Sequence, residues 1–188
     1  MNNNNITHKM FLSLMIPFIL STITQPLLGA ADIAVVGKLN NVNYISGVSI
    51  GTLIFNTIYW IFGFLRVSTT AFSAQSSHYS DKKRVSDIFF RPIMIALFIS
   101  LIMVIFQNII FESSMKFIKP ELEIEKAAIT YFKILIWGAP FVLTNYVLLG
   151  WLMGLGNIKA SMTMQISGNL LNIILDQEKA KFYLKKIY

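Results

Sequence analysis

The sequence predicts an all-α integral membrane protein with five transmembrane helices, and three observations lead to this fold class. Of the 188 residues, 55% are hydrophobic and 13% are charged, whereas about a quarter of the residues of a soluble domain are charged. The mean hydropathy is +0.61. A membrane-spanning helix needs about 20 apolar residues, so the chain has room for five spans and short loops but not for a soluble enzyme domain.

The first two helices are predicted from long apolar runs. The run over 11–36 is longer than the core of a signal peptide, about 7 to 15 residues, so we expect it to cross the membrane. A second run, followed by small and mildly polar residues, predicts a helix over 44–74. Residues 1–9 contain a run of asparagines and are expected to form a disordered cytoplasmic N-terminus.

The third helix is expected over 92–111. Pro92 suits a first helical turn, because its missing N–H would have no partner there. The charged residues of 112–126 predict a loop or an interfacial turn.

The last two helices are expected over 128–155 and 158–176. Pro140 falls inside the first of them, which a membrane helix tolerates when its neighbours satisfy the freed carbonyl. The composition then changes abruptly. Residues 177–188 carry four lysines and one glutamate, so they cannot form a sixth span.

Charge and the absence of motifs exclude several functions. The net charge of +7 gathers at the ends of the spans, where lysine and arginine orient membrane proteins, so no nucleic-acid partner is expected. The chain has no cysteine, no serine–histidine–acid set and no phosphate-binding glycine loop. We therefore expect neither an enzyme nor an ATP-driven pump, and no cofactor beyond a coupling ion.

Two acids lie within predicted spans, Asp32 and Asp176, and both are expected in the half of the membrane away from the N-terminus. Intramembrane acids usually face the bundle interior and often mark ion paths. Each acid ends a stripe of polar and small residues at helical spacing: Ser21, Gln25, Gly29 and Asp32, and Ser161, Gln165, Asn169, Asn172 and Asp176.

The stripes lead to the hypothesis that Asp32, Asn172 and Asp176 form one site for Na⁺ or H⁺. A carboxyl in a low-dielectric cavity can bind a proton near neutral pH, because its charged form is disfavoured there. Two carboxyls and an amide oxygen could instead bind Na⁺. The sequence does not decide between the proton and Na⁺. Gln25, Gln165 and Asn169 are expected to line the polar cavity. The alternative is that these amides only join packed helices by hydrogen bonds.

Other residues have simpler interpretations. Gly47 with Gly51, and Gly150 with Gly154, permit close helix approach. Arg66 is interpreted as an anchor that reaches the membrane interface. Pro17 and Pro26 bracket a stretch that acts either as a hinge or as a static kink.

Four patches resemble the multidrug and toxic compound extrusion (MATE) family, specifically its bacterial DinF-like branch. They are Pro26 to Gly37, Phe62 to Arg66, Gly138 to Leu152 and Asn169 to Asp176. The resemblance implies a twelve-helix antiporter in two six-helix lobes, located in the bacterial inner (cytoplasmic) membrane. It also implies Na⁺- or H⁺-coupled export of cationic or amphipathic organic compounds.

The resemblance also implies roles for single residues. Asp32 matches the family's helix 1 acid, Asn172 and Asp176 match its Asn-x-x-x-Asp on helix 5, and Pro17 matches a proline linked to helix 1 bending. Residues 10–176 would then be an incomplete six-helix N-terminal lobe, and 177–188 a tail foreign to the family.

Because transport by rocking two repeats needs both lobes, we expect a truncated chain that is inactive alone unless a second chain supplies the missing lobe. Two alternatives remain. One is a fragment of a lipid-linked oligosaccharide flippase, and the other is a non-transporting membrane interaction subunit.

Overall fold

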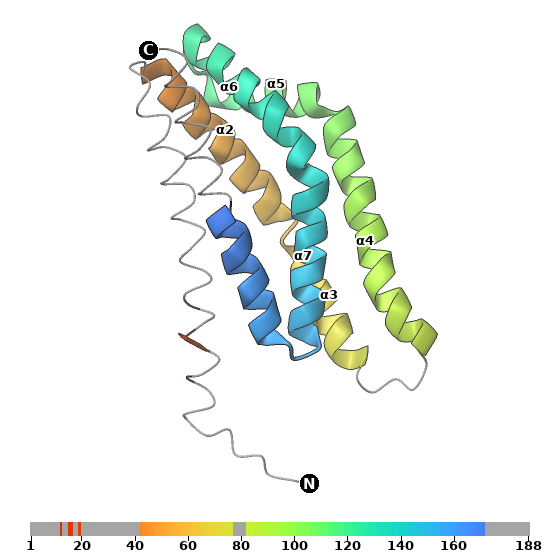
Figure 1. Cartoon of the computed structure of the whole chain (residues 1–188). Coiled ribbons are helices and arrows are strands. Elements are labelled where there is room, and N and C mark those ends of the chain that lie inside the picture. Colours follow the sequence, from red (N-terminus) through yellow and green to blue (C-terminus); the bar gives the residue numbers. More distant parts are fainter. Residues whose placement is uncertain (1–11, 13–14, 17–18, 20–41, 77–81, 172–188) are drawn as a thin grey trace.

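A computed structural model of the chain describes residues 12, 15–16, 19, 42–76 and 82–171, and every regular element in the two long stretches is helical. The all-α fold class is thus confirmed. The helices run up and down in a bundle (Figure 1). They are α2 (Val42–Ile61), α3 (Phe64–Ser76), α4 (Lys82–Ile105), α5 (Gln107–Ile118), α6 (Leu122–Leu135), the 3₁₀ turn η1 (Ile136–Gly138), α7 (Ala139–Gly154) and a helix over 158–171.

Three helical stretches among these residues are long and apolar enough to cross a membrane: Val42–Ser76, Ser86–Ile105 and Leu122–Gly154. They correspond to the second, third and fourth predicted helices. We call the end of the bundle crossed by α5 the α5 end, and the opposite end, where α3 and α7 finish, the α3 end (top and bottom of Figure 1).

The second predicted helix, 44–74, is nearly right in extent but is broken in the middle. Its α2 begins two residues earlier and its α3 ends two residues later than predicted. At the break the amide of Gly63 bonds to the Trp60 carbonyl at 3.1 Å, three residues back rather than four. One tight turn therefore separates α2 from α3 without ending the span.

The predicted start of the third helix is wrong. Its α4 begins at Lys82, and Pro92 lies inside it. An interior proline removes only one backbone hydrogen bond, and the preceding turns are supported by an i,i+4 ion pair between Arg91 Nη2 and Asp87 Oδ2 at 2.7 Å. The charges near Pro92 thus belong to the exposed first turns of the helix rather than to a connection before it.

The predicted end of the third helix at residue 111 is also wrong, and most of the stretch 112–126, predicted to be a loop or an interfacial turn, is helical, in α5 and in the first turn of α6. The chain turns at Phe106 and forms α5, which lies across the end of the bundle (Figure 1). This 12-residue helix is about 18 Å long, too short to cross a membrane. It ends at Ile118 and is capped by Lys119, whose amide donates to the Met115 carbonyl at 2.8 Å. The left-handed φ of 51° at Lys119 then turns the chain out of the helix, and Pro120 follows.

The fourth predicted helix, 128–155, begins earlier and is interrupted. Its α6 starts at Leu122, with Glu123 and Glu125 in the first turn, where acids complement the helix dipole. Pro140 does not lie inside a continuous helix as predicted. It occupies the first turn of α7, immediately after η1, where its missing N–H costs nothing.

The core at the α5 end is aromatic. Phe132 of α6 is 1% exposed and stacks on Phe55 of α2, with ring centroids 4.9 Å apart. Phe111 of α5 contacts the same ring at 5.4 Å. Three elements are therefore joined through one phenyl side chain.

The core at the α3 end is built from small and hydroxyl residues. Gly150 of α7 lies against the backbone of Arg66, and Gly154 lies against Ser73 and the Thr70 carbonyl. At the α5 end, Gly47 likewise lies against the backbone of α6. Both glycine pairs thus permit the close helix approach that the sequence predicts.

Candidate ion and substrate site

The polar stripe of the helix over 158–171 faces the interior of the bundle. Ser161 is 2% exposed and Gln165 is 7% exposed, while Asn169, one turn further on, is half-buried. The residues on the other faces are largely exposed, among them Thr163, Met164, Ser167, Leu170 and Leu171. The prediction that these polar residues share one face of a helix is therefore confirmed as far as residue 171.

Local contacts fix this helix against α7. The side-chain Oδ1 of Asn157 accepts a hydrogen bond from the Ala160 amide at 3.3 Å, as a helix N-cap does. Gly156 precedes it with a positive φ of 76°, which favours glycine. Ser161 Oγ then donates to the Leu149 carbonyl of α7 at 3.4 Å. A turn and two hydrogen bonds thus set the direction in which Gln165 and Asn169 point.

Most of the predicted site lies outside the described residues. The residues concerned are Pro17, Gln25, Pro26, Asp32, Asn172 and Asp176. Of the predicted cavity residues, Gln165 and Asn169 are described, and each makes an interaction. The ion site and the proline hinge therefore stay predictions, and the stripe 161–169 is the described part that leads toward them.

A second polar cluster surrounds Arg66 of α3. The guanidinium Nη2 lies 3.2 Å from Met153 Sδ of α7. Tyr146, also on α7, is within electrostatic range of the guanidinium, and Tyr59 of α2 is within range of Tyr146. No sequence signal links Arg66 to Tyr146 or Met153, because these residues lie 80 or more positions away along the chain.

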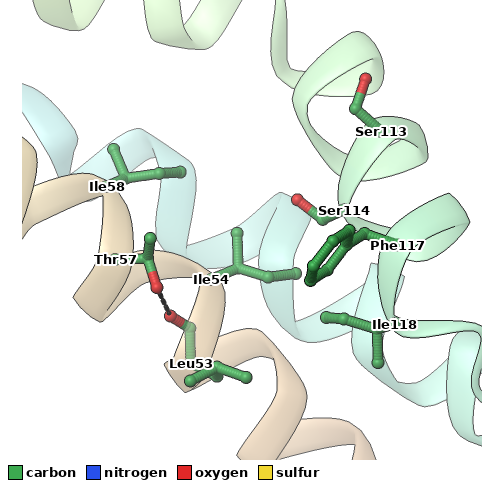
Figure 2. Close-up of a pocket in the computed structure, with 8 residues that line it drawn as sticks. All are labelled: Leu53, Ile54, Thr57, Ile58, Ser113, Ser114, Phe117 and Ile118. Carbon is green, nitrogen blue, oxygen red and sulfur yellow. Dashed lines mark hydrogen bonds between the residues drawn. The ribbon is translucent and has the colours of Figure 1, made fainter.

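An apolar groove of about 420 Å³ lies between α2 and α5 (Figure 2). It is lined by Leu53, Ile54, Thr57, Ile58, Ser113, Ser114, Phe117 and Ile118. Two of its hydroxyls are engaged by their own helices, since Thr57 donates to the Leu53 carbonyl at 2.9 Å and Ser114 to the Ile110 carbonyl at 2.8 Å. The groove therefore has few free hydrogen-bonding groups for a polar ligand.

No group of three histidine, cysteine or acidic side chains gathers to hold a metal ion within residues 42–76 and 82–171. The acids of these stretches are Asp87 on α4, Glu112 on α5, and Glu121, Glu123 and Glu125 at the beginning of α6.

This geometry defines a multi-pass helical membrane bundle with a polar face turned inward, and a comparison with solved structures agrees. A MOP superfamily transporter from Pyrococcus furiosus matches with a TM-score of 0.76 and 25% identity, over 88% of this chain and 36% of that one. Its description reports a binding pocket of reverse polarity, which suggests a different function for that protein.

The chain belongs to the MatE family, whose model matches residues 17–177. Members of this family are multi-pass membrane transporters rather than enzymes. The DNA damage-inducible protein F of Escherichia coli (strain K12) is 32% identical over 163 residues, which are 87% of this chain and 36% of that protein. The multidrug resistance protein MdtK of Klebsiella pneumoniae is 31% identical over 167 residues, 88% of this chain and 36% of that one.

The resemblance to the MATE family and its DinF-like branch is thus confirmed. The chain spans about a third of the length of these relatives, 36% in each case. The family match ends at residue 177, and the description of 177–188 as foreign to the family stays a prediction.

Proposed function

We propose that the chain forms part of one lobe of a cation-coupled MATE-type transporter, which exports organic compounds across the cytoplasmic membrane of a bacterium. Family membership and the multidrug-resistance relative support this proposal. The observation that carries it is the inward-facing stripe of Ser161, Gln165 and Asn169, because polar side chains buried in a membrane bundle usually mark a path for ions or substrates.

The coupling site we propose is Asp32 with Asn172 and Asp176. In a helix continued beyond residue 171, Asn172 and Asp176 follow Asn169 by three and seven positions and fall on the same face. Carboxylate and amide oxygens there would bind either Na⁺ or a proton. The substrate proposed is a cationic or amphipathic organic compound, attracted to the acids once the coupling ion leaves.

The test is transport by the chain joined to the C-terminal remainder of its E. coli relative and reconstituted in proteoliposomes. Ion-driven movement of an organic cation, such as ethidium, is followed under separate Na⁺ and H⁺ gradients. We expect Asp32→Asn and Asp176→Asn each to lower the transport rate at least about tenfold, since each removes one ion ligand.

Asp87→Asn is the matched control, because Asp87 is an acid whose ion pair with Arg91 is exposed. Its rate is expected to stay within about twofold of the parent, as exposed pairs contribute little. Unchanged transport in both Asp32→Asn and Asp176→Asn would exclude the proposed site. Preferential transport of an organic anion, such as fluorescein, would exclude the proposed substrate class.

We also propose that the 188-residue chain needs the second lobe for activity, because rocking two repeats about a midplane site requires both. Proteoliposomes holding the chain alone are expected to show no gradient-dependent transport, and adding the complementary lobe is expected to restore it. Robust transport by the chain alone would contradict this proposal.

The alternative of a non-transporting interaction subunit relied on small-residue faces free to pair with another protein. In the structure Gly47 and Gly51 contact α6, and Gly150 and Gly154 contact α3. These faces are used for packing within the chain, which favours the transporter proposal.

A further inference from the structure

The groove between α2 and α5 is lined by residues that belong neither to the polar stripe 161–169 nor to the proposed ion site. Its volume of about 420 Å³ lies within the range of ligand pockets. Ser114, Phe117 and Ile118 of α5 project toward α2, where Ile54 forms the facing wall (Figure 2). Phe117 is 91% exposed, so the groove is open along this rim.

The lining of the groove suits a hydrocarbon chain. The hydroxyls of Thr57 and Ser114 are bonded to carbonyls of their own helices, and the walls are otherwise mostly aliphatic and aromatic. A lipid chain brings no polar group that would lose its partners on entering. It also supplies the close contacts that an empty groove would forfeit.

An exposed charge places the groove near the membrane surface. Phe132 of α6 packs on Phe55 of α2, which follows the groove residue Ile54, and on Phe111 of α5. The next residue of α6, Lys133, is exposed, and lysines in spans extend their amines to the interface. Because α5 lies across the same end of the bundle (Figure 1), the groove opens where hydrocarbon meets headgroups.

Two lysines adjoin the groove. Lys116 precedes the groove residue Phe117, and Lys119 follows the groove residue Ile118. Both lysines are exposed, and neither forms an ion pair with another residue of 42–76 and 82–171, whereas Lys126 is paired with Glu123 at 2.9 Å. Lysines at a membrane surface attract anionic lipid headgroups.

We propose that this groove binds one acyl chain of an anionic phospholipid, whose phosphate lies against Lys116 and Lys119. The acyl chain covers Ile54, Phe117 and Ile118, and the two lysines neutralise the headgroup. The groove thus selects for a lipid chain, and the lysines select for an anionic headgroup. This site is separate from the proposed path for ions and organic compounds and does not depend on transport.

The test uses the full chain in a neutral maltoside detergent. Native mass spectrometry compares retention of phosphatidylglycerol with that of phosphatidylcholine, and we expect phosphatidylglycerol to be retained at least about fivefold better. A phosphatidylglycerol that carries a diazirine on one acyl chain then labels the residues that the chain contacts. Label is expected in peptides that contain residues 53–58 and 113–118.

Lys116→Gln combined with Lys119→Asn tests the headgroup contact. Asparagine is chosen at position 119 because it tolerates the left-handed φ of 51° there. We expect retention of phosphatidylglycerol to fall at least about fivefold, to the level of phosphatidylcholine. Lys159→Gln is the matched control, since Lys159 is exposed and follows α7 at the opposite end of the bundle; its retention should stay within about twofold of the parent.

Ser114→Leu tests the acyl-chain contact, because Ser114 projects into the groove (Figure 2). Its larger side chain takes the space of the lipid, so label in both stretches is expected to fall at least about threefold. Thr130→Leu is the matched control. Thr130 is exposed on α6 outside the groove, and its hydroxyl bonds four residues back, to the Lys126 carbonyl at 3.0 Å, as Ser114 does to Ile110. Its label should stay within about twofold of the parent.

Loss of label in Ser114→Leu, together with loss of headgroup preference in the lysine variant, supports the proposal. Equal retention of the two lipids by the parent overturns it, as does unchanged label in Ser114→Leu or unchanged retention in the lysine variant. If Ser114→Leu is unstable, the lysine variant decides, because both of its positions are exposed.

Two other occupants of the groove give different results. A dimer in the mass spectrum that dissociates in Ser114→Leu would assign the groove to a second copy of the chain. Loss of label when the chain is joined to the C-terminal remainder of its E. coli relative would assign the groove to the second lobe. Either result overturns the lipid site.

Discussion

At the α5 end of the bundle, α2 meets α6 around the stacked rings of Phe55 and Phe132, whereas at the α3 end α3 meets α7 through glycines and hydroxyl side chains. Both contacts join the same two spans, Val42–Ser76 and Leu122–Gly154. Lipid chains are as apolar as leucine, so hydrophobicity alone cannot hold helices together in a membrane. The comparison shows two other ways of doing so, broad aromatic contact and close backbone approach.

The division also matters for function. Six polar residues of the described stretches have less than a tenth of their surface exposed: Thr69, Ser73 and Ser76 on α3, Ser100 on α4, and Ser161 and Gln165 on the helix over 158–171. The glycine-rich contact thus lies beside the largest group of them, on α3, and beside the Arg66 cluster, whereas the stacked rings of the other contact are apolar. We expect the first region to carry stability and the second to combine stability with ligand contact.

The largest effect is expected from Phe132→Ala, which removes the ring shared by α2, α5 and α6. Phe132 is 1% exposed and contacts Phe55 and Phe111. Large-to-small core changes leave a cavity, and we expect a loss of about 3 kcal/mol in the free energy of unfolding. Unfolding in mixed micelles with increasing sodium dodecyl sulfate measures it, and a loss below about 1 kcal/mol would show that the aromatic contact contributes little.

Gly154→Ala tests the other contact. A Cβ at this position would lie 2.5 Å from the Thr70 carbonyl and 2.9 Å from the Ala74 amide, both backbone atoms that cannot move without shifting α3. We expect a loss of about 2 kcal/mol, within the range for overpacking. Gly168→Ala is the control, since no atom lies within 4 Å of its added Cβ and alanine is the better helix former. A stable Gly154→Ala variant would contradict the close backbone approach.

Gly51→Ala should be milder, although its nearest contact distance is the same. Its added Cβ would meet Tyr131 Cδ1 at 2.5 Å, which is a side-chain atom that can give way. Displacement of the whole Tyr131 side chain would break its 3.4 Å hydrogen bond with Thr52, so we expect a loss of about 1 kcal/mol. A cost equal to that of Gly154→Ala would show that the two ends of the bundle are equally rigid.

The smallest effect is expected from Ser73→Ala. Ser73 Oγ donates to the Trp151 carbonyl at 3.0 Å, which joins α3 to α7. Interhelical hydrogen bonds in membranes contribute about 0.6 kcal/mol, and the same loss is expected in micelle unfolding. A loss above about 2 kcal/mol would mean that hydrogen bonding, rather than glycine packing, holds the α3 end together.

Much of this fold was predictable because a lipid environment imposes simple rules on sequence. Apolar length gave the positions of the spans, and the glycine spacings marked the helix contacts. The inward face of Ser161, Gln165 and Asn169 followed from steps of four residues. What failed was the interpretation of prolines and charges, since Pro92 lies inside a helix and the charges near residue 112 belong to α5.

By itself, the sequence determined the membrane class, the approximate positions of three spans and the shared face of Ser161, Gln165 and Asn169, because hydropathy and helical periodicity act locally along the chain. The tertiary structure decided the broken spans, the placement of α5 across the bundle and the contact of Arg66 with Met153. These features depend on which helices pack together, and residues about 80 positions apart carry no local signal of their contact. For the same physical reason the polar residues could be identified from the sequence, whereas the residue that contacts the Arg66 guanidinium could not.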